Sequence, residues 1–226
     1  MGNIDLQRNV SQRTPCILVL DHSASMETPT SSGLTRIQEL NAGLLAFAET
    51  LRRDPVALSR VQIAIVSVGG DSAELLLDWT DADDFEPFQL STEGSTPLAS
   101  GIQLALHCIE NQKALLRQHG IQYTRPWMFI LTDGEPTDPG HQWAKACAEA
   151  RQAESNGAVL IFPVGVADAN LAKISEISST KPKMLQSTNF KELFVWLSAS
   201  LSKITRSKPG EEINLPSTDG WSAIKL

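Results

Sequence analysis

Cysteine is scarce in this chain, with three among its 226 residues: Cys16, Cys108 and Cys147. No two of them form a CxxC pair, and each lies in or beside an apolar run. An odd number of widely separated cysteines argues against a disulfide framework. We therefore expect three reduced core side chains and a protein of a reducing compartment, the cytoplasm.

Long apolar runs and an excess of positive charge are also missing. No run approaches the ~20 residues that a membrane-spanning helix needs, and the first ten residues, MGNIDLQRNV, lack the apolar core of a signal peptide. The formal net charge is −7. We expect neither nucleic acid nor a membrane as a partner, because both attract basic patches, whereas a negative balance is compatible with binding cations.

What the sequence does contain is enough apolar material for one large α/β domain. Its hydrophobic fraction of 42% is ordinary for a globular protein. Residues 14–206 show regular apolar patterns, whereas the last twenty residues lose all periodicity. We predict an N-terminal extension at 1–13, one domain at 14–206, and a tail or linker at 207–226.

Short apolar runs alternate with helical periods along this domain. Buried strands are predicted at four runs: Cys16–Leu20, Val61–Val68, Trp127–Thr132 and Val159–Val166. Apolar residues at three- and four-residue steps predict helices that cover Ile37–Leu51, the region from Pro97 to Ile109, Pro139–Ser155, Leu171–Ile177 and Phe190–Ile204. Ala73–Trp79 follows the second run so closely that we expect an antiparallel edge strand there, and Met184–Leu185 forms a weak last strand. The alternation favours a mostly parallel sheet covered by helices on both faces.

Polar side chains stand where several of these elements meet. Asp21, Ser23 and Ser25 follow the first strand, Thr96 precedes a helix, and Asp133 ends a later strand. Sites in open parallel sheets form outside the carboxyl ends of the strands, so we expect these five groups to converge. All five offer hard oxygen atoms, which favours Mg²⁺ or Mn²⁺ as the ligand.

Such a site would hold its ion with only two carboxylates. The ion would keep residual positive charge, and a vacant coordination position would attract an external carboxylate. The chemistry therefore predicts a metal site that binds an Asp or Glu of a partner protein.

Three segments carry a family resemblance: DHSASM at 21–26, GSTPL at 94–98 and LTDGEPTD at 131–138. In order and separation they resemble the metal-ion-dependent adhesion site of von Willebrand factor A domains. The resemblance runs from about Thr14 to Ile204. It implies a Rossmann-like α/β fold, with an open, mostly parallel sheet, one antiparallel edge strand and helices on both faces.

The resemblance also implies roles for the site residues and a biological setting. Ser23 and Ser25 would bind the metal directly, Thr96 directly or through water, and Asp21 and Asp133 mostly through water. The sequences around 125–127 and 132–138 resemble the bacterial tellurium-resistance-associated branch of the family. That branch implies a protein kinase or a metal-dependent phosphatase as the partner.

Structural interpretations of the same residues stay open. Ser23 and Ser25 can form turns, Thr96 can cap the helix that begins near Pro97, and Asp138 can serve as an N-cap before Pro139. His22, Ala24 and Val68 depart from residues common in the family, but none of them removes a ligand oxygen.

A Mg²⁺-dependent phosphoryl-transfer enzyme on a similar fold is the alternative function. Phosphatases of the haloacid dehalogenase type resemble this first segment but carry DxDxT, whereas Ser23 replaces the second carboxylate here. A Walker A loop is absent, no lysine lies close to these segments, and we find no nucleophile–base pair. We predict a binding module and not an enzyme.

Overall fold

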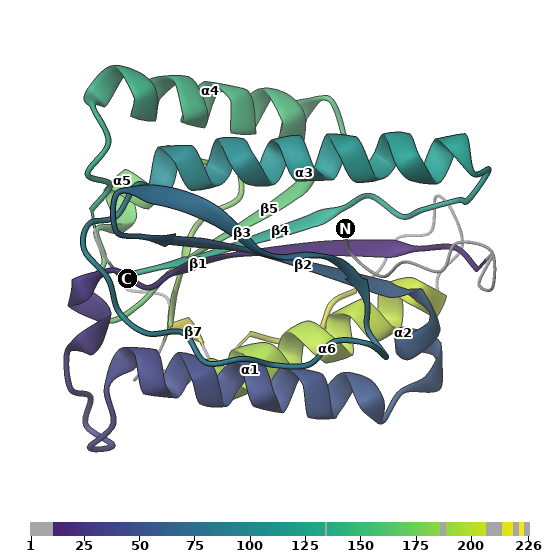
Figure 1. Ribbon diagram of the computed structural model, residues 1–226, viewed down its shortest axis with the longest axis horizontal. Coiled ribbons are helices and arrows are strands. Elements are labelled where there is room, and N and C mark those ends of the chain that lie inside the picture. Colours follow the sequence, from purple (N-terminus) through teal and green to yellow (C-terminus); the bar gives the residue numbers. More distant parts are fainter. Residues whose placement is uncertain (1–10, 134, 186–188, 207–213, 219–221, 224–226) are drawn as a thin grey trace.

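A twisted sheet forms the centre of the computed structural model, which describes residues 11–133, 135–185, 189–206, 214–218 and 222–223. Within these ranges the sheet has seven strands in the order β3-β2-β1-β4-β5-β6-β7 (Figure 1). The strands are β1 (Thr14–Asp21), β2 (Val61–Gly69), β3 (Ser72–Asp81), β4 (Trp127–Thr132), β5 (Leu160–Gly165), β6 (Lys183–Leu185) and β7 (Ser222–Ala223).

The pairing confirms the predicted fold class. Strands β2, β1, β4, β5 and β6 run parallel, and β3 pairs antiparallel with β2 at one edge. A second antiparallel strand, the two-residue β7, pairs with β6 at the other edge. Strand β7 was not predicted, because it lies in the segment expected to be a tail or linker.

Helices cover both faces of the sheet, as predicted. Helices α1 (Arg36–Arg52), α2 (Pro55–Arg60) and α6 (Phe190–Arg206) lie on one side, and α3 (Leu98–Gln118) and α4 (Gly140–Ser155) lie on the other (Figure 1). A 3₁₀ turn (Ala24–Glu27) follows β1, and the short α5 (Leu171–Ile174) follows β5.

Strand β1 is buried on both faces, which explains its continuous apolar run. Cys16 and Leu18 belong to the core under α1 and α6, whereas Ile17 and Val19 belong to the core under α3 and α4. All four side chains are fully buried. Alternate residues of a strand point to opposite faces, so a strand between two helical layers must be apolar throughout.

Helix α2 was not predicted, because Asp54-Pro55 was interpreted only as the stop of the preceding helix. The stop is real, since α1 ends at Arg52, but the same dipeptide also starts α2. Proline is tolerated in the first turn of a helix. Asp54 Oδ1 accepts hydrogen bonds from the amides of Val56 (3.0 Å) and Ala57 (3.2 Å), which caps the new helix.

Asp54 offers a test of this cap. Its carboxylate also accepts two 2.7 Å hydrogen bonds from Arg206. Burial alone would raise the pKa of Asp54, but hydrogen bonds from Ser202, Arg206 and the two helix amides outweigh it and lower the pKa below 3.8. We expect Asp54→Ala to reduce the free energy of unfolding by about 1–2 kcal/mol near neutral pH.

The lowered pKa fixes the sign of the pH dependence. The contribution of Asp54 is complete above pH 3.8 and is lost as the pH falls through its folded pKa, so the deficit of the variant should shrink in acid. Urea unfolding across this range measures the effect, with Asp54→Asn as the control that keeps a good cap. A deficit of constant size at every pH would contradict the explanation.

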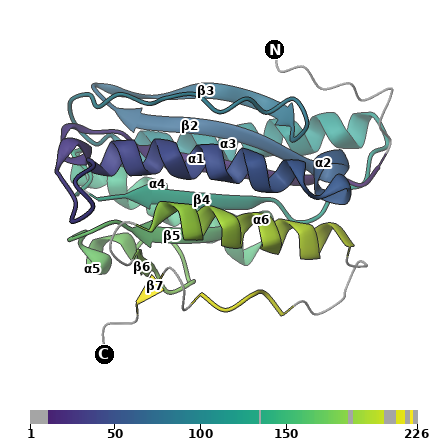
Figure 2. The ribbon, with the colours of Figure 1, turned by 90° about the horizontal axis from the view of Figure 1, so that it is seen from below.

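The described part of the C-terminal segment lies against the domain. Leu215 packs on the core under α6, and the Nε1 of Trp196 donates to the carbonyl oxygen of Pro216 (2.9 Å). Figure 2 shows residues 214–218 running back along α6 toward β6 and β7. The division at residue 206 stays a prediction, and Trp221 lies outside the described residues. No helix in the described part of the chain has both the length and the apolar character needed to cross a membrane.

Candidate metal site at the carboxyl end of the sheet

Asp21 ends β1 and lies fully buried at the carboxyl edge of the sheet. Its Oδ1 accepts a hydrogen bond from the amide of Ser23 (2.9 Å), and its Oδ2 accepts one from Oγ1 of Thr132 (2.5 Å). Burial raises the pKa of Asp21. These hydrogen bonds act against that rise, and the nearby charge of Asp133 adds to it. Both of these hydrogen-bond donors to the carboxylate are neutral groups.

Two serines connect this loop to the end of β4. The Oγ atoms of Ser23 and Ser25 lie 3.0 Å apart, and the Oγ of Ser25 donates to Oδ1 of Asp133 (2.6 Å). The 3₁₀ turn after Ser23 brings both hydroxyls to the same side of the loop. Asp21, Ser23, Ser25 and Asp133 therefore form one cluster, although Asp133 is 108 residues away from Ser25 in sequence.

Thr96 reaches the cluster through backbone contacts on both sides. The amide of Ala24 donates to the carbonyl oxygen of Gly94 (3.0 Å), and the amide of Thr137 donates to that of Thr96 (3.0 Å). Thr96 is only 5% exposed. No hydrogen bond joins its hydroxyl to any other described residue.

Gly94 makes this arrangement possible. Its φ is +49°, and a Cβ at this position would lie 2.7 Å from the Cα of Gly70. The two glycines form a backbone bridge that holds the Thr96 segment beside the end of β2. A side chain at position 94 would push the two backbones apart.

The structure corrects two structural interpretations of these residues. The N-cap of α3 is Pro97 and not Thr96, and it makes no side-chain cap. Asp138 does act as a cap, but for α3: its carboxylate accepts from the amides of Ala99 (2.9 Å) and Ser100 (3.4 Å). Helix α4, which Asp138 was expected to cap, begins after Pro139 without a side-chain cap.

The donor set fits a hard divalent cation. Two carboxylates and three hydroxyls are grouped here, and all of them offer the hard oxygen atoms that such a cation prefers. No group of three His, Cys, Asp or Glu side chains within the described ranges could hold an ion. Any metal at this site would therefore depend on the hydroxyl oxygens.

Arg36 is a member of the site that the sequence analysis missed. It is the first residue of α1, and its two terminal nitrogens reach Oδ2 of Asp133 (2.6 Å) and Oδ1 of Asp168 (2.9 Å). The side chain of Asp133 is fully buried, and that of Arg36 is 12% exposed. Thus one site carboxylate already contacts a cation of the chain itself.

Comparisons with known proteins identify the family. The model of the von Willebrand factor type A domain matches residues 16–135, more than half of the chain. The chain belongs to this family. Domains of the family mediate protein–protein interactions and adhesion, and they are typically binding modules. No curated protein matches the chain.

Solved structures share the fold at low sequence identity. Proximal thread matrix protein 1 from the mussel byssus is 16% identical with a TM-score of 0.53, over 86% of this chain and 49% of its own. This chain thus spans about half of that protein. The SpRpn10 VWA domain is 16% identical with a TM-score of 0.53, over 80% of this chain and 93% of its own. The vWF domain of the pilus tip protein Mfa5 from Porphyromonas gingivalis is 12% identical with a TM-score of 0.63, over 90% and 99%.

Proposed function

We propose that this chain is a metal-dependent protein–protein interaction module. The observation that carries the proposal is the cluster of Asp21, Ser23, Ser25 and Asp133, which joins the ends of β1 and β4. Mg²⁺, or Mn²⁺ in its place, binds there through these oxygens and Thr96. The partner supplies an Asp or Glu carboxylate to the ion.

The composition of the cluster supports this role. The hydroxyl ligands add no negative charge, and the two carboxylates act mostly through water, so the bound ion remains electrophilic toward an anionic ligand. A metal–carboxylate contact shielded from water can anchor an interface. A catalytic role has less support. The Oγ of Ser25 donates to the carboxylate of Asp133 (2.6 Å), but that carboxylate is also ion-paired with Arg36, and it is therefore not free to act as a general base.

The partner we propose is a protein kinase or a metal-dependent phosphatase. This assignment rests on the resemblance of the 125–127 and 132–138 segments to the tellurium-resistance-associated branch. Calorimetry with such a partner tests it directly, in Mg²⁺ and in EDTA. Equal affinity under both conditions would show that the metal is not the anchor.

Turnover of a phosphate ester in Mg²⁺, abolished by Asp21→Ala, would establish the enzymatic alternative instead.

Metal binding should stabilise the fold without being required for it. The two apolar cores do not involve the site oxygens, so circular dichroism in EDTA should show a folded chain. Mg²⁺ at a hundred times its Kd should raise the free energy of unfolding by about 2.7 kcal/mol. Urea unfolding with and without Mg²⁺ measures this rise. An unfolded chain in EDTA, or no stabilisation by saturating Mg²⁺, would contradict the expectation.

A further inference from the structure

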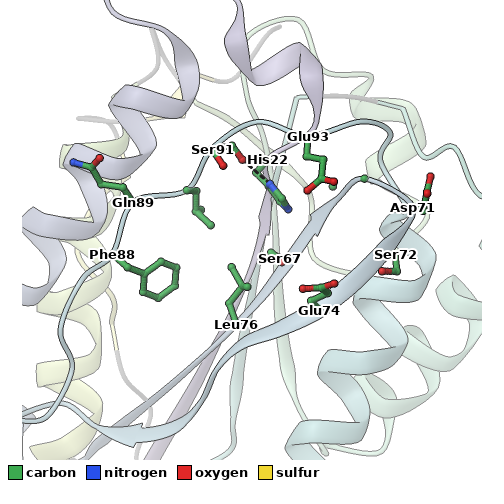
Figure 3. A pocket seen from close by; sticks show the side chains of 13 residues that line it. His22, Ser67, Asp71, Ser72, Glu74, Leu76, Phe88, Gln89, Ser91 and Glu93 are labelled. Atoms are coloured by element: carbon green, nitrogen blue, oxygen red, sulfur yellow. Dashed lines mark hydrogen bonds between the residues drawn. The ribbon is translucent and has the colours of Figure 1, made fainter.

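A cavity of about 470 Å³ opens beside the metal site. It lies between the end of β2, the start of β3 and residues 88–93 (Figure 3). Two of its lining residues adjoin the metal cluster in sequence: His22 follows Asp21, and Glu93 precedes the Gly94–Thr96 segment. A ligand that reaches the metal would therefore pass close to this cavity.

Hydrogen bonds hold the walls of the cavity in place. Asn41 of α1 fixes the 88–93 segment through two hydrogen bonds. Its side chain donates to the carbonyl oxygen of Leu90 and accepts from the amide of Leu90, both at 2.9 Å. The backbone of Glu93 is bonded to His22 and to Gly70, each at 2.8 Å. The cavity is thus a preformed feature and needs little rearrangement to accept a ligand.

Negative charge dominates the lining. Asp71, Glu74 and Glu93 line the cavity, and the lining contains no lysine or arginine. None of these three carboxylates forms an ion pair or a side-chain hydrogen bond with another described residue. Figure 3 shows Glu74 and Glu93 on either side of the hollow, with Asp71 at its rim.

Two further polar side chains, Ser67 and His22, lie at this end of the cavity. Ser67 of β2 is only 2% exposed and lines the cavity, yet no described residue bonds to its hydroxyl. The Nδ1 of His22 lies 2.8 Å from the carbonyl oxygen of Ser91. A carbonyl can only accept, so Nδ1 is the donor in this contact. The charged groups of the lining are all carboxylates, and its other polar side chains are hydroxyls, one amide and one imidazole, so the cavity offers no cation to balance them.

The shape favours an extended cation over a metal ion. Within the described part of the chain, no three acidic, histidine or cysteine side chains are grouped closely enough to hold an ion. Leu76 and Phe88 supply apolar surface to the cavity, and Phe88 lies well apart from the three carboxylates (Figure 3). An arginine side chain matches both halves, since its stem is apolar and its guanidinium presents five donors in a planar fork.

We propose that this cavity binds a basic side chain, arginine above all, of the partner protein. The guanidinium contacts Glu74, Glu93 and Ser67, while the stem packs on Leu76 and Phe88. Together with the proposed function, this means that the partner segment carries both an acidic residue for the metal and a basic residue for the cavity. The cavity itself does not depend on the metal, so the two proposals can be tested separately.

The first experiment titrates the whole chain with N-acetylarginine amide in EDTA, followed by NMR of the backbone amides. N-acetylcitrulline amide, which has the same shape without the charge, is the control ligand. We expect shifts at His22, Ser67 and Glu93 with the arginine probe and about tenfold weaker binding of citrulline. Equal binding of the two probes would overturn the proposal, and so would displacement of the arginine probe by Ca²⁺ in a second titration without EDTA.

Variants assign the effect to the carboxylates. The double variant Glu74→Gln/Glu93→Gln should weaken the arginine probe by at least about tenfold. The matched control is Glu49→Gln/Glu192→Gln, which removes two exposed carboxylates that lie outside the cavity lining. Equal affinity in both double variants would show that charge in the cavity is not what binds the probe.

A final measurement tests whether one peptide can occupy the metal site and the cavity together. Peptides of acetyl-Asp-(Gly)n-Arg-amide, with n from one to four, are titrated in Mg²⁺ and in EDTA. One spacing should bind more tightly in Mg²⁺ than either N-acetyl-Asp amide or the arginine probe alone, because the second contact becomes intramolecular. If the binding depends on arginine but is equally tight in Mg²⁺ and in EDTA, the metal-anchored function and the two-site partner segment are both refuted. The proposal that the cavity binds arginine would then still hold. Loss of arginine dependence at every spacing would refute the cavity.

Discussion

Replacing Ser23 and Ser25 together by alanine should weaken Mg²⁺ binding by at least about a hundredfold. Each substitution removes one hydroxyl oxygen from the cluster, and a loss of about 1.4 kcal/mol per ligand corresponds to a tenfold change in Kd. The substitutions also release Oδ1 of Asp133 from its 2.6 Å hydrogen bond with Ser25. Calorimetric titration with Mg²⁺ measures the change.

The variant should remain folded, because backbone contacts hold the loop. The amide of Ala24 is bonded to Gly94, and the amide of Met26 to the carbonyl oxygen of residue 23. The side chain of Met26 is 1% exposed and anchors the 3₁₀ turn in the core. Alanine at positions 23 and 25 alters none of these contacts, so circular dichroism in EDTA should match that of the wild type.

The control is Ser31→Ala/Ser32→Ala in the next loop. Both serines are exposed, and Ser32 bonds to Glu39 and Thr30, outside the cluster. Mg²⁺ affinity in this control should equal that of the wild type. If the Ser23→Ala/Ser25→Ala variant also kept full affinity, the cluster would not be the metal site.

The sheet was predictable from local apolar patterns. Strands buried between two helical layers, such as β1 and β4, are continuous apolar runs that need no distant information. Helix α2 was missed because Asp54-Pro55 both stops one helix and caps the next. Strand β7 was missed because two residues in a polar segment carry no periodicity.

The candidate site was predictable in part. The convergence of Asp21, Ser23, Ser25 and Asp133 follows from the rule that polar residues after parallel strands share one edge of the sheet. The contact of Asp138 with the first turn of α3 was not foreseeable in this way, since nothing local to a residue shows which helix it faces. The cavity beside His22 likewise arises from four segments that meet only in the folded chain.

Arg36 leads to the last prediction: Arg36→Gln should tighten Mg²⁺ binding by about tenfold. Its guanidinium lies 2.6 Å from Oδ2 of Asp133 and 2.9 Å from Asp168, so it neutralises part of the charge that a metal would use. A metal ion at the cluster would be repelled by this cation while it remains on Asp133. Glutamine is shorter than arginine, but it keeps a polar group and removes the charge.

Two observations indicate that Arg36→Gln keeps the structure around the cluster. The Oδ1 of Asp133 stays bonded to Ser25 in the variant, so the carboxylate retains one fixed contact. Helix α1 keeps its start, because the capping box of Thr35 and Gln38 does not involve the side chain of Arg36. Arg53→Gln, at the other end of α1, removes the same charge from an exposed position and is the matched control.

Calorimetry with Mg²⁺ and with Mn²⁺ distinguishes the two possible roles of Arg36. Competition predicts a lower Kd for both ions in Arg36→Gln and no change in Arg53→Gln. The gain should be largest at low ionic strength, because salt screens the repulsion between a partly exposed arginine and the ion. A higher Kd in Arg36→Gln would mean that Arg36 positions Asp133 for the metal. The prediction that Arg36 and the metal ion compete for Asp133 would then be wrong.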